Sequence, residues 1–112
     1  MQQPVDTAAL EELKNIMGED FALLIDVFVS DSEQRISGLK KALSEKNALS
    51  LRNIAHGFKG SALNLSATQL TELCRQLEAM GRDNLLDEAP ATLTRLIEEF
   101  DSVKRYFIEQ RQ

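Results

Sequence analysis

The chain has 112 residues, 43% of them hydrophobic and 28% charged, which is typical of one folded domain and argues against a disordered segment. Thirteen basic and 18 acidic residues give a net charge of −5, which disfavours a general binder of nucleic acid or of anionic membrane surfaces. One cysteine precludes an intrachain disulfide and one histidine leaves too few ligands for a zinc site, so we expect no metal and a reducing, cytoplasmic location.

Apolar residues recur at intervals of three and four along the chain, a pattern that favours amphipathic helices over strands. Residues 1–6 have neither the basic nor the apolar region of a secretion signal, and no apolar run approaches the ~20 residues that span a bilayer. A first, short helix is predicted from about Thr7 to Met17. Asp6 or Thr7 can cap its start, and Gly18 is suited to its end.

A long second helix is predicted from about Asp20 to Lys46, and a third from about Ala48 to Leu63. Leu23 and Val27 fall off the apolar stripe of the second helix, so they need another cover. The first helix and a partner protein are the two candidates for that cover.

The fourth helix is predicted to open with a capping box, in which Ser66 is the N-cap and Gln69 the third helical residue, and to stop at Gly81. A fifth helix is predicted from about Glu88 to Gln110. Four long amphipathic helices joined by short loops predict an all-α fold, an antiparallel up-down four-helix bundle over about residues 20–110. The short first helix would cover this bundle within a single domain, residues 1–112.

The single histidine lies on the third helix. Steps of 100° per residue place His56 roughly 150° from the centre of the apolar stripe, so its ring should face solvent. Arg52 and Lys59 lie on the same outer half, one turn before and one turn after it. Residues 47–71 contain no acidic residue, although the composition predicts about four. This locally cationic surface suits a small anion such as a phosphoryl group.

Two glycines, Gly57 and Gly60, interrupt the same helix, and each costs about 1 kcal/mol relative to alanine. Close approach of another backbone would give that cost a use, and a kink or an early helix end is the alternative. Gly60 lies one turn beyond His56, where a side chain would block access to the ring.

The chemistry that fits this surface is phosphoryl transfer. A neutral imidazole is a nitrogen nucleophile that can accept a phosphoryl group and hand it on. Such a transfer requires positioning and positive charge near the phosphoryl oxygens, which Lys59 is placed to supply. One ring nitrogen must also be held by a hydrogen-bond acceptor to fix the tautomer.

Two consecutive segments resemble the histidine-containing phosphotransfer (HPt) domains. They are Ile54 to Ala67, IAHGFKGSALNLSA, and Leu70 to Arg82, LTELCRQLEAMGR. The resemblance extends over roughly residues 20–110. It implies a four-helix bundle that acts as a carrier in a multistep phosphorelay, taking a phosphoryl group from an aspartate of one receiver domain and passing it to another.

The resemblance also implies residue roles. His56 matches the phosphorylated residue, Lys59 the phosphoryl-stabilising cation and Gly60 the small residue that admits the partner. Glu78 matches a position whose side chain steadies the other ring nitrogen, and Arg82 matches a second basic position near the site. Because Glu78 and Arg82 are four residues apart, an ordinary helical ion pair is the alternative for these two.

The family further implies that the receiver domain supplies the Mg²⁺ for the exchange, so we expect no cofactor and no ATP-dependent kinase activity in this chain. The expected partners are receiver domains of a hybrid sensor histidine kinase and of a response regulator, bound to a monomer. Ser61 matches a family serine with a structural role, whereas Ala62 and Ser66 depart from the usual serine and glycine. The residues expected to contact the partner are Arg52, Gly57, Gly60, Leu63 and Arg75.

A different class of function also fits the helical pattern. The chain could be a helical interaction module that binds a partner without phosphate chemistry, with Leu23, Val27 and Leu63 on its docking surface. Cys74 lies on the apolar stripe of the fourth helix, where a small buried side chain is expected and not a redox switch.

Overall fold

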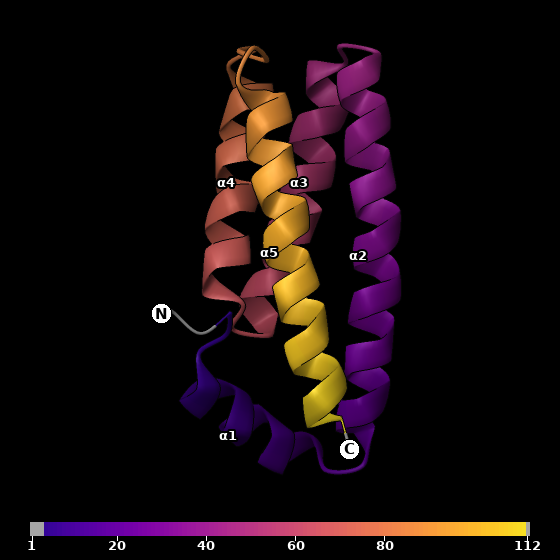
Figure 1. Cartoon of the computed structure of the whole chain (residues 1–112), viewed down its shortest axis with the longest axis vertical. Helices are drawn as coiled ribbons and strands as arrows, with labels where there is room; N and C mark the ends of the chain where they lie inside the picture. Colours follow the sequence, from indigo (N-terminus) through magenta and orange to yellow (C-terminus); the bar gives the residue numbers. More distant parts are fainter. Residues whose placement is uncertain (1–3, 112) are drawn as a thin grey trace.

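The computed structural model describes residues 4–111, so the part of the signal-peptide prediction that rests on residues 1–3 lies outside the described residues. The described chain forms α1 Thr7–Met17, α2 Asp20–Ser44, α3 Ala48–Asn64, α4 Thr68–Arg82 and α5 Ala89–Gln110. Helices α2 to α5 form an antiparallel bundle, and α1 lies across one of its ends (Figure 1). The predicted all-α bundle with a cover helix is confirmed, and the predicted helix ends agree within two residues. None of the helices in residues 4–111 is long and apolar enough to cross a bilayer.

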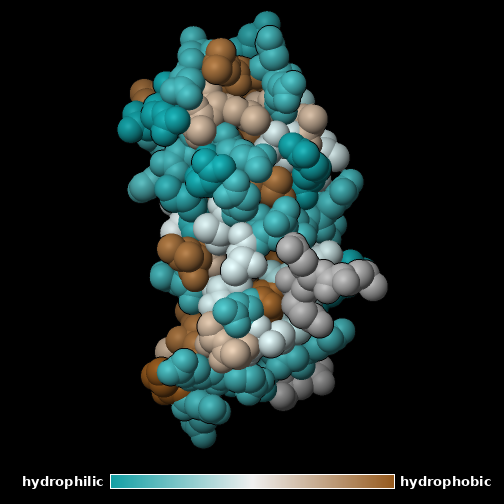
Figure 2. Space-filling view, turned by 90° about the vertical axis from the view of Figure 1, so that its left-hand side faces the viewer, coloured by the Kyte–Doolittle hydropathy of each residue, from teal (hydrophilic) through white to brown (hydrophobic). Residues whose placement is uncertain are grey.

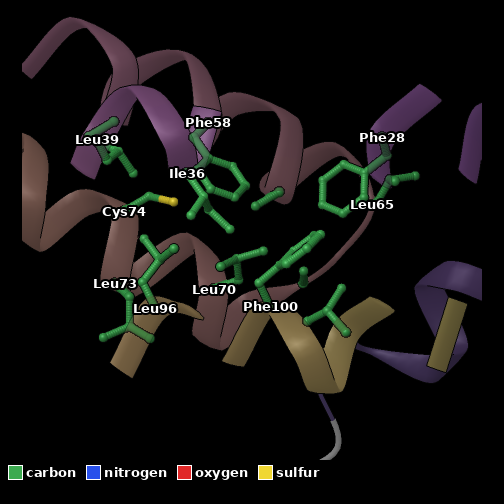
Figure 3. Close-up of a cluster of buried hydrophobic side chains, with 14 of the residues drawn as sticks. Phe28, Ile36, Leu39, Phe58, Leu65, Leu70, Leu73, Cys74, Leu96 and Phe100 are labelled. Atoms are coloured by element: carbon green, nitrogen blue, oxygen red, sulfur yellow. The ribbon is translucent and has the colours of Figure 1, made fainter. Parts of the chain in front are cut away.

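Aromatic side chains from three helices meet in the core and fix the rotation of α3. Phe58 of α3 is fully buried, and its ring lies 6.4 Å from that of Phe100 on α5. Phe28 of α2 packs against the same ring (Figure 3). Burying a phenylalanine side chain contributes roughly 2 kcal/mol, which strongly favours this orientation of α3. Because His56 precedes Phe58 by two residues, or about 200° of helix, it must lie on the outer side.

The first helix is held at both ends by the predicted caps. Oδ1 of Asp6 accepts a hydrogen bond from the backbone N–H of Ala9, and Gly18 adopts the positive φ of 57° that favours glycine. The segment before α1 is also anchored, since Val5 is buried and the N–H of Asp6 donates to the carbonyl of Ser66 at 2.8 Å. The chain start is therefore joined to the turn between α3 and α4.

Of the two candidate covers for Leu23 and Val27, helix α1 leaves both side chains exposed. Leu23 is 64% exposed and Val27 is 48% exposed. Helix α1 crosses the end of the bundle instead of running along α2. Its Leu13 and Met17 line a hollow of about 390 Å³ together with Val27, and this contact leaves Val27 half exposed. The other candidate cover, a partner protein, remains open.

The predicted capping box at the start of α4 is also wrong. Helix α4 begins at Thr68 after Ala67, and no side chain caps it. Ser66 has a φ of 60° instead, and its N–H donates to the carbonyl of Leu63. The tight turn requires one residue in the left-handed region, because buried Ala67 must reach back to bond the carbonyl of Ala62. Ser66 therefore occupies the position for which a glycine would be conformationally easier.

Close approach of two helices occurs at Gly81, where the sequence predicted only a helix end. Gly81 is buried one residue before α4 ends, and a Cβ there would lie 2.7 Å from both the carbonyl oxygen of Ala48 and the backbone nitrogen of Arg52. By contrast, a Cβ at Gly60 would meet nothing within 4 Å. Helix α3 runs through Gly57 and Gly60 to Asn64, so neither glycine ends it early.

Candidate functional site

The ring of His56 stands on the outer flank of α3. Its side chain is 68% exposed, as the helical geometry predicts. The ring projects from the middle of a 17-residue helix whose inner face Phe58 anchors in the core. A group on a packed helix is held more rigidly than one on a loop, so the base of this side chain is fixed before any partner arrives.

One carboxylate from α4 connects His56 and Lys59. Nδ1 of His56 lies 2.8 Å from Oε2 of Glu78, and Nζ of Lys59 lies 2.6 Å from Oε1 of the same side chain. The hydrogen bond from Lys59 is the largest influence on the pKa of Glu78 and lowers it, partial desolvation opposes this, and the hydrogen bond from His56 lowers it further. Glu78 is therefore an ionised acceptor at neutral pH.

This bridge fixes the tautomer of the neutral ring. An ionised carboxylate can only accept hydrogen bonds, so the proton between His56 and Glu78 must belong to Nδ1. The lone pair of the neutral ring then lies on Nε2, which points away from Glu78. The arrangement presents one nitrogen nucleophile of the imidazole to solvent and holds the other nitrogen.

The two predicted site arginines of α4 bind acidic neighbours instead of Glu78. Arg82 binds Asp83, with Nε 3.1 Å from Oδ1, and Arg75 binds Glu72 at 2.8 Å. The alternative, an ion pair between Glu78 and Arg82, therefore does not form. The pKa of Arg82 is raised mainly by Asp83, and the charge of Glu78 adds a smaller contribution. Their site roles remain predictions. The face that carries α4 is mostly hydrophilic, with hydrophobic residues as separate islands (Figure 2).

Three of the predicted partner-contact residues of α3 lie along the accessible flank beside His56, whereas Gly57 is covered by the guanidinium of Arg35. Gly60 leaves bare backbone one turn after the ring. Leu63 lies about two turns after the ring and is 63% exposed. The side chain of Arg52 is exposed one turn before the ring, while its backbone packs against Gly81. An open strip thus runs on both sides of the ring, and partner contact along it remains a prediction.

Arg35 is a further residue at this site that the sequence reasoning did not find. It reaches from α2, and its Nη1 donates to Oγ of Ser61 at 2.6 Å. Its guanidinium also lies against Gly57, the neighbour of His56. The usable signal was the spacing of Gly57 and Ser61, because two small residues four apart on one helical face leave room for a long side chain from a neighbouring helix.

Cys74 has the structural role that its position predicts. The side chain is buried behind α4 beside Leu39 and Leu73 (Figure 3). Desolvation is the main reason that the pKa of its thiol rises to about 12. The thiol is therefore protonated at neutral pH and behaves as a small apolar group.

Comparison with known proteins places this geometry in a family. The model of the Hpt domain matches residues 23–106. The crystal structure of histidine-containing phosphotransfer protein B (HptB) from Pseudomonas aeruginosa PAO1 has a TM-score of 0.96 and 36% identity, covering the whole chain and 97% of that protein.

Two curated proteins match over shorter stretches. The phosphorelay protein LuxU of Vibrio harveyi is 29% identical over 80 residues, 70% of each chain. The phosphorelay intermediate protein YPD1 of Candida albicans is 36% identical over 58 residues, which is 52% of this chain and about a third, 32%, of that protein. The family model covers well over half of the chain, and the bundle superimposes on a solved member along its whole length, so this chain belongs to the Hpt domain family.

Proposed function

We propose that this chain is a histidine phosphocarrier of a phosphorelay, in which Nε2 of His56 accepts a phosphoryl group from an aspartate of one receiver domain and passes it to another. The observation that carries the proposal is the bridge from Glu78, which holds Nδ1 and leaves Nε2 free in solvent. Membership of the Hpt domain family, and the phosphorelay names of LuxU and YPD1, support the same role.

Phosphoryl transfer to His56 requires no proton donor or acceptor beyond the residues of the site. The lone pair of Nε2 attacks phosphorus, an N–P bond forms, and the P–O bond to the aspartate breaks as the carboxylate leaves with the bonding pair. The proton on Nδ1 stays in place, so the phosphorylated ring carries a positive charge that faces the carboxylate of Glu78. The second transfer reverses these bonds with the aspartate of the next receiver.

Lys59 supports the phosphoryl group while it remains bound to Glu78. An ammonium group has three N–H donors, and Glu78 accepts from one of them. The other two can donate to phosphoryl oxygens, which carry the negative charge of the transition state. Glu78 thereby sets the positions of both the nucleophile and the cation.

The carrier needs neither ATP nor a cofactor of its own. Both oxygens of Glu78 already accept from His56 and Lys59, so the charge of this carboxylate is balanced by a cation of the chain itself. The receiver domain holds the Mg²⁺ of the exchange, and the partners are the receivers of a hybrid sensor histidine kinase and of a response regulator. Monomeric state and a cytoplasmic location belong to the same proposal.

The direct test is a transfer assay with a phosphorylated receiver domain. The purified chain should take up the label, and the product should be labile in acid and stable in alkali, as a phosphoramidate is. Incubation with labelled ATP in place of the receiver should leave the chain unlabelled. The carrier role would be contradicted if no receiver domain labels the chain, or if the labelled product is stable in acid.

The alternative function, a helical interaction module without phosphate chemistry, has one observation in its favour. Leu23 and Leu63 are both more than 60% exposed, and exposed leucines can serve partner binding. If the chain is such a module, variants of His56 should retain both partner affinity and cellular activity. If it is a phosphocarrier, the same variants should lose cellular activity.

Replacing Glu78 by alanine is expected to slow phosphoryl acceptance by about tenfold to a hundredfold. A hydrogen bond to a charged group contributes about 1.5–3 kcal/mol, and here two of them position the ring and Lys59. Glu78→Gln should lose less, because its amide oxygen can still accept from Nδ1. Single-turnover labelling rates measure both, and equal rates for Glu78→Ala and the unmodified chain would exclude the positioning role.

The bridge also has a defined pH dependence. Because the pKa of Glu78 is lowered in the folded chain, the stability that the bridge contributes is complete above the ordinary carboxyl pKa of 4.5 and is lost as the pH falls through the lowered value. In urea titrations, the difference in unfolding free energy between the unmodified chain and Glu78→Gln should therefore shrink toward acid pH.

Replacing Gly60 by glutamine is expected to slow transfer at least about tenfold with little change in stability. Nothing lies within 4 Å of a Cβ at this position, and glycine in a helix costs about 1 kcal/mol relative to alanine, so the fold should tolerate the change. The added side chain would instead obstruct the approach to His56. Transfer rates and urea unfolding should be measured for Gly60→Gln and the smaller Gly60→Ala. Transfer by Gly60→Gln at the unmodified rate would refute the steric role.

A further inference from the structure

Arg35 lies flat against α3 beside His56. Its Nη1 donates to Oγ of Ser61 at 2.6 Å. Its Nη2, Cζ and Nε lie 3.7, 3.9 and 3.9 Å from the position that a Cβ of Gly57 would take. Three atoms of a planar group at nearly equal distance from one point indicate that the guanidinium faces the helix. Gly57 therefore provides the room for a cation at the residue adjoining His56.

Arg35 forms no ion pair within residues 4–111, although the carboxylate of Asp31 lines the same hollow between α2 and α3. Lys59 pairs with Glu78, and the α4 cations Arg75 and Arg82 pair with acidic neighbours. For Arg35 the described chain offers only the neutral hydroxyl of Ser61, so most of its five N–H donors have no protein acceptor. In the resting site, Lys59 is already balanced by a carboxylate, and Arg35 adds positive charge beside it.

Space for a partner group adjoins this guanidinium. A polar hollow of about 380 Å³ lies between α2 and α3, lined by Asp31, Gln34, Arg35, Gly38 and Ile54. The free N–H donors of Arg35 can thus meet a group that enters from outside. The planar fork of arginine suits a carboxylate, which it can bind through two parallel hydrogen bonds.

We propose that Arg35 is a receiver-binding residue, whose guanidinium binds a carboxylate at the docking edge of the phosphorylated receiver and holds that domain with its phosphoryl group over Nε2 of His56. This inference rests on the phosphocarrier function proposed above. A domain that binds Mg²⁺ beside a phosphorylated aspartate has an acidic site there, and an acidic docking edge around that site would be opposite in sign to Arg35. The contact lies on the α2 side of the ring, opposite the α4 side that carries Glu78.

The test compares Arg35→Met with Lys40→Met at several concentrations of phosphorylated receiver. Both variants remove one positive charge from α2, and Lys40 is exposed, with no ion pair or hydrogen bond in the described chain. Arg35→Met should lower kcat/KM for labelling about tenfold, mainly through KM, and the loss should shrink as salt is added. Lys40→Met should stay within about twofold of the unmodified chain.

A third variant separates recognition from a purely structural contact. Ser61→Ala removes the acceptor but leaves the charge of Arg35, so it should keep most of the transfer rate. The inference is overturned if Arg35→Met behaves like Lys40→Met, or if Ser61→Ala reproduces the loss of rate together with an equal loss of urea stability. If the unmodified chain accepts no label from any receiver, the phosphocarrier function itself fails, and this outcome is distinct from the other two.

Discussion

Replacing His56 by glutamine is expected to abolish phosphoryl labelling while leaving the free energy of unfolding within about 0.5 kcal/mol of the unmodified chain. Glutamine has no ring nitrogen that can attack phosphorus, so no rate should remain. The ring is 68% exposed and contributes little to packing, and glutamine is a good helix former. Its amide can still donate to Glu78, so that carboxylate keeps a partner.

Two measurements on the same preparation test this result. Labelling from a phosphorylated receiver, followed by intact mass, reports acceptance, and urea unfolding followed by circular dichroism reports the fold. Residual label in His56→Gln would show that another residue accepts the phosphoryl group. A folded variant that binds receivers and retains cellular activity would instead favour the phosphate-independent interaction module.

Replacing Gly81 by alanine is expected to destabilise the bundle by roughly 2–3 kcal/mol. The new Cβ would lie 2.7 Å from the carbonyl oxygen of Ala48 and from the backbone nitrogen of Arg52, and 2.9 Å from the Cα of Arg52. All three atoms belong to the backbone, so no side chain can rotate to relieve the clash. Helix α4 would have to move away from α3, and this outweighs the gain in helix propensity.

The matched control is Gly60→Ala, the same substitution on a neighbouring helix. Its Cβ would meet nothing within 4 Å, so we expect it to gain about 0.5–1 kcal/mol. The two variants should thus shift the urea midpoint in opposite directions. Gly81→Ala should also slow transfer, because Glu78 lies three residues earlier on the helix that must move. Equal midpoints for the two variants would contradict the close packing at Gly81.

The sequence predicted the helices well because each buries one apolar face, and that periodicity is local information. The outward direction of His56 followed from the same pattern, with Phe58 on the opposite side. The turn before α4 was mispredicted for a different reason. Ser66 and Gln69 satisfy a capping-box pattern, but buried Ala67 decides the backbone path, and burial of that residue depends on the neighbouring helices. Gly81 likewise resembles a helix stop until the position of α3 is known.

Lys59 and Glu78, two of the predicted site residues, do lie beside His56, but the contacts between them were less predictable. The pairing of Glu78 with the ring came from family resemblance, since 22 residues separate it from His56 along the chain. Lys59 was expected to serve the phosphoryl group, and its bond to Glu78 was not expected. Arg35 escaped prediction because its contact with Ser61 joins two helices across 26 residues, and no local pattern encodes which long side chain fills the space above Gly57.

The position of the His56 ring on one flank of a packed helix has a kinetic consequence for the proposed phosphocarrier. Under the proposed phosphocarrier function, donor and acceptor each bring an aspartate to the same nitrogen of His56, so their complexes with the carrier exclude one another and no ternary complex lies on the route. The relay should then follow ping-pong kinetics, in which excess of either receiver inhibits the reaction by occupying the wrong form of the carrier. A carrier that must release one domain before it binds the next is served better by weak, short-lived docking than by high affinity.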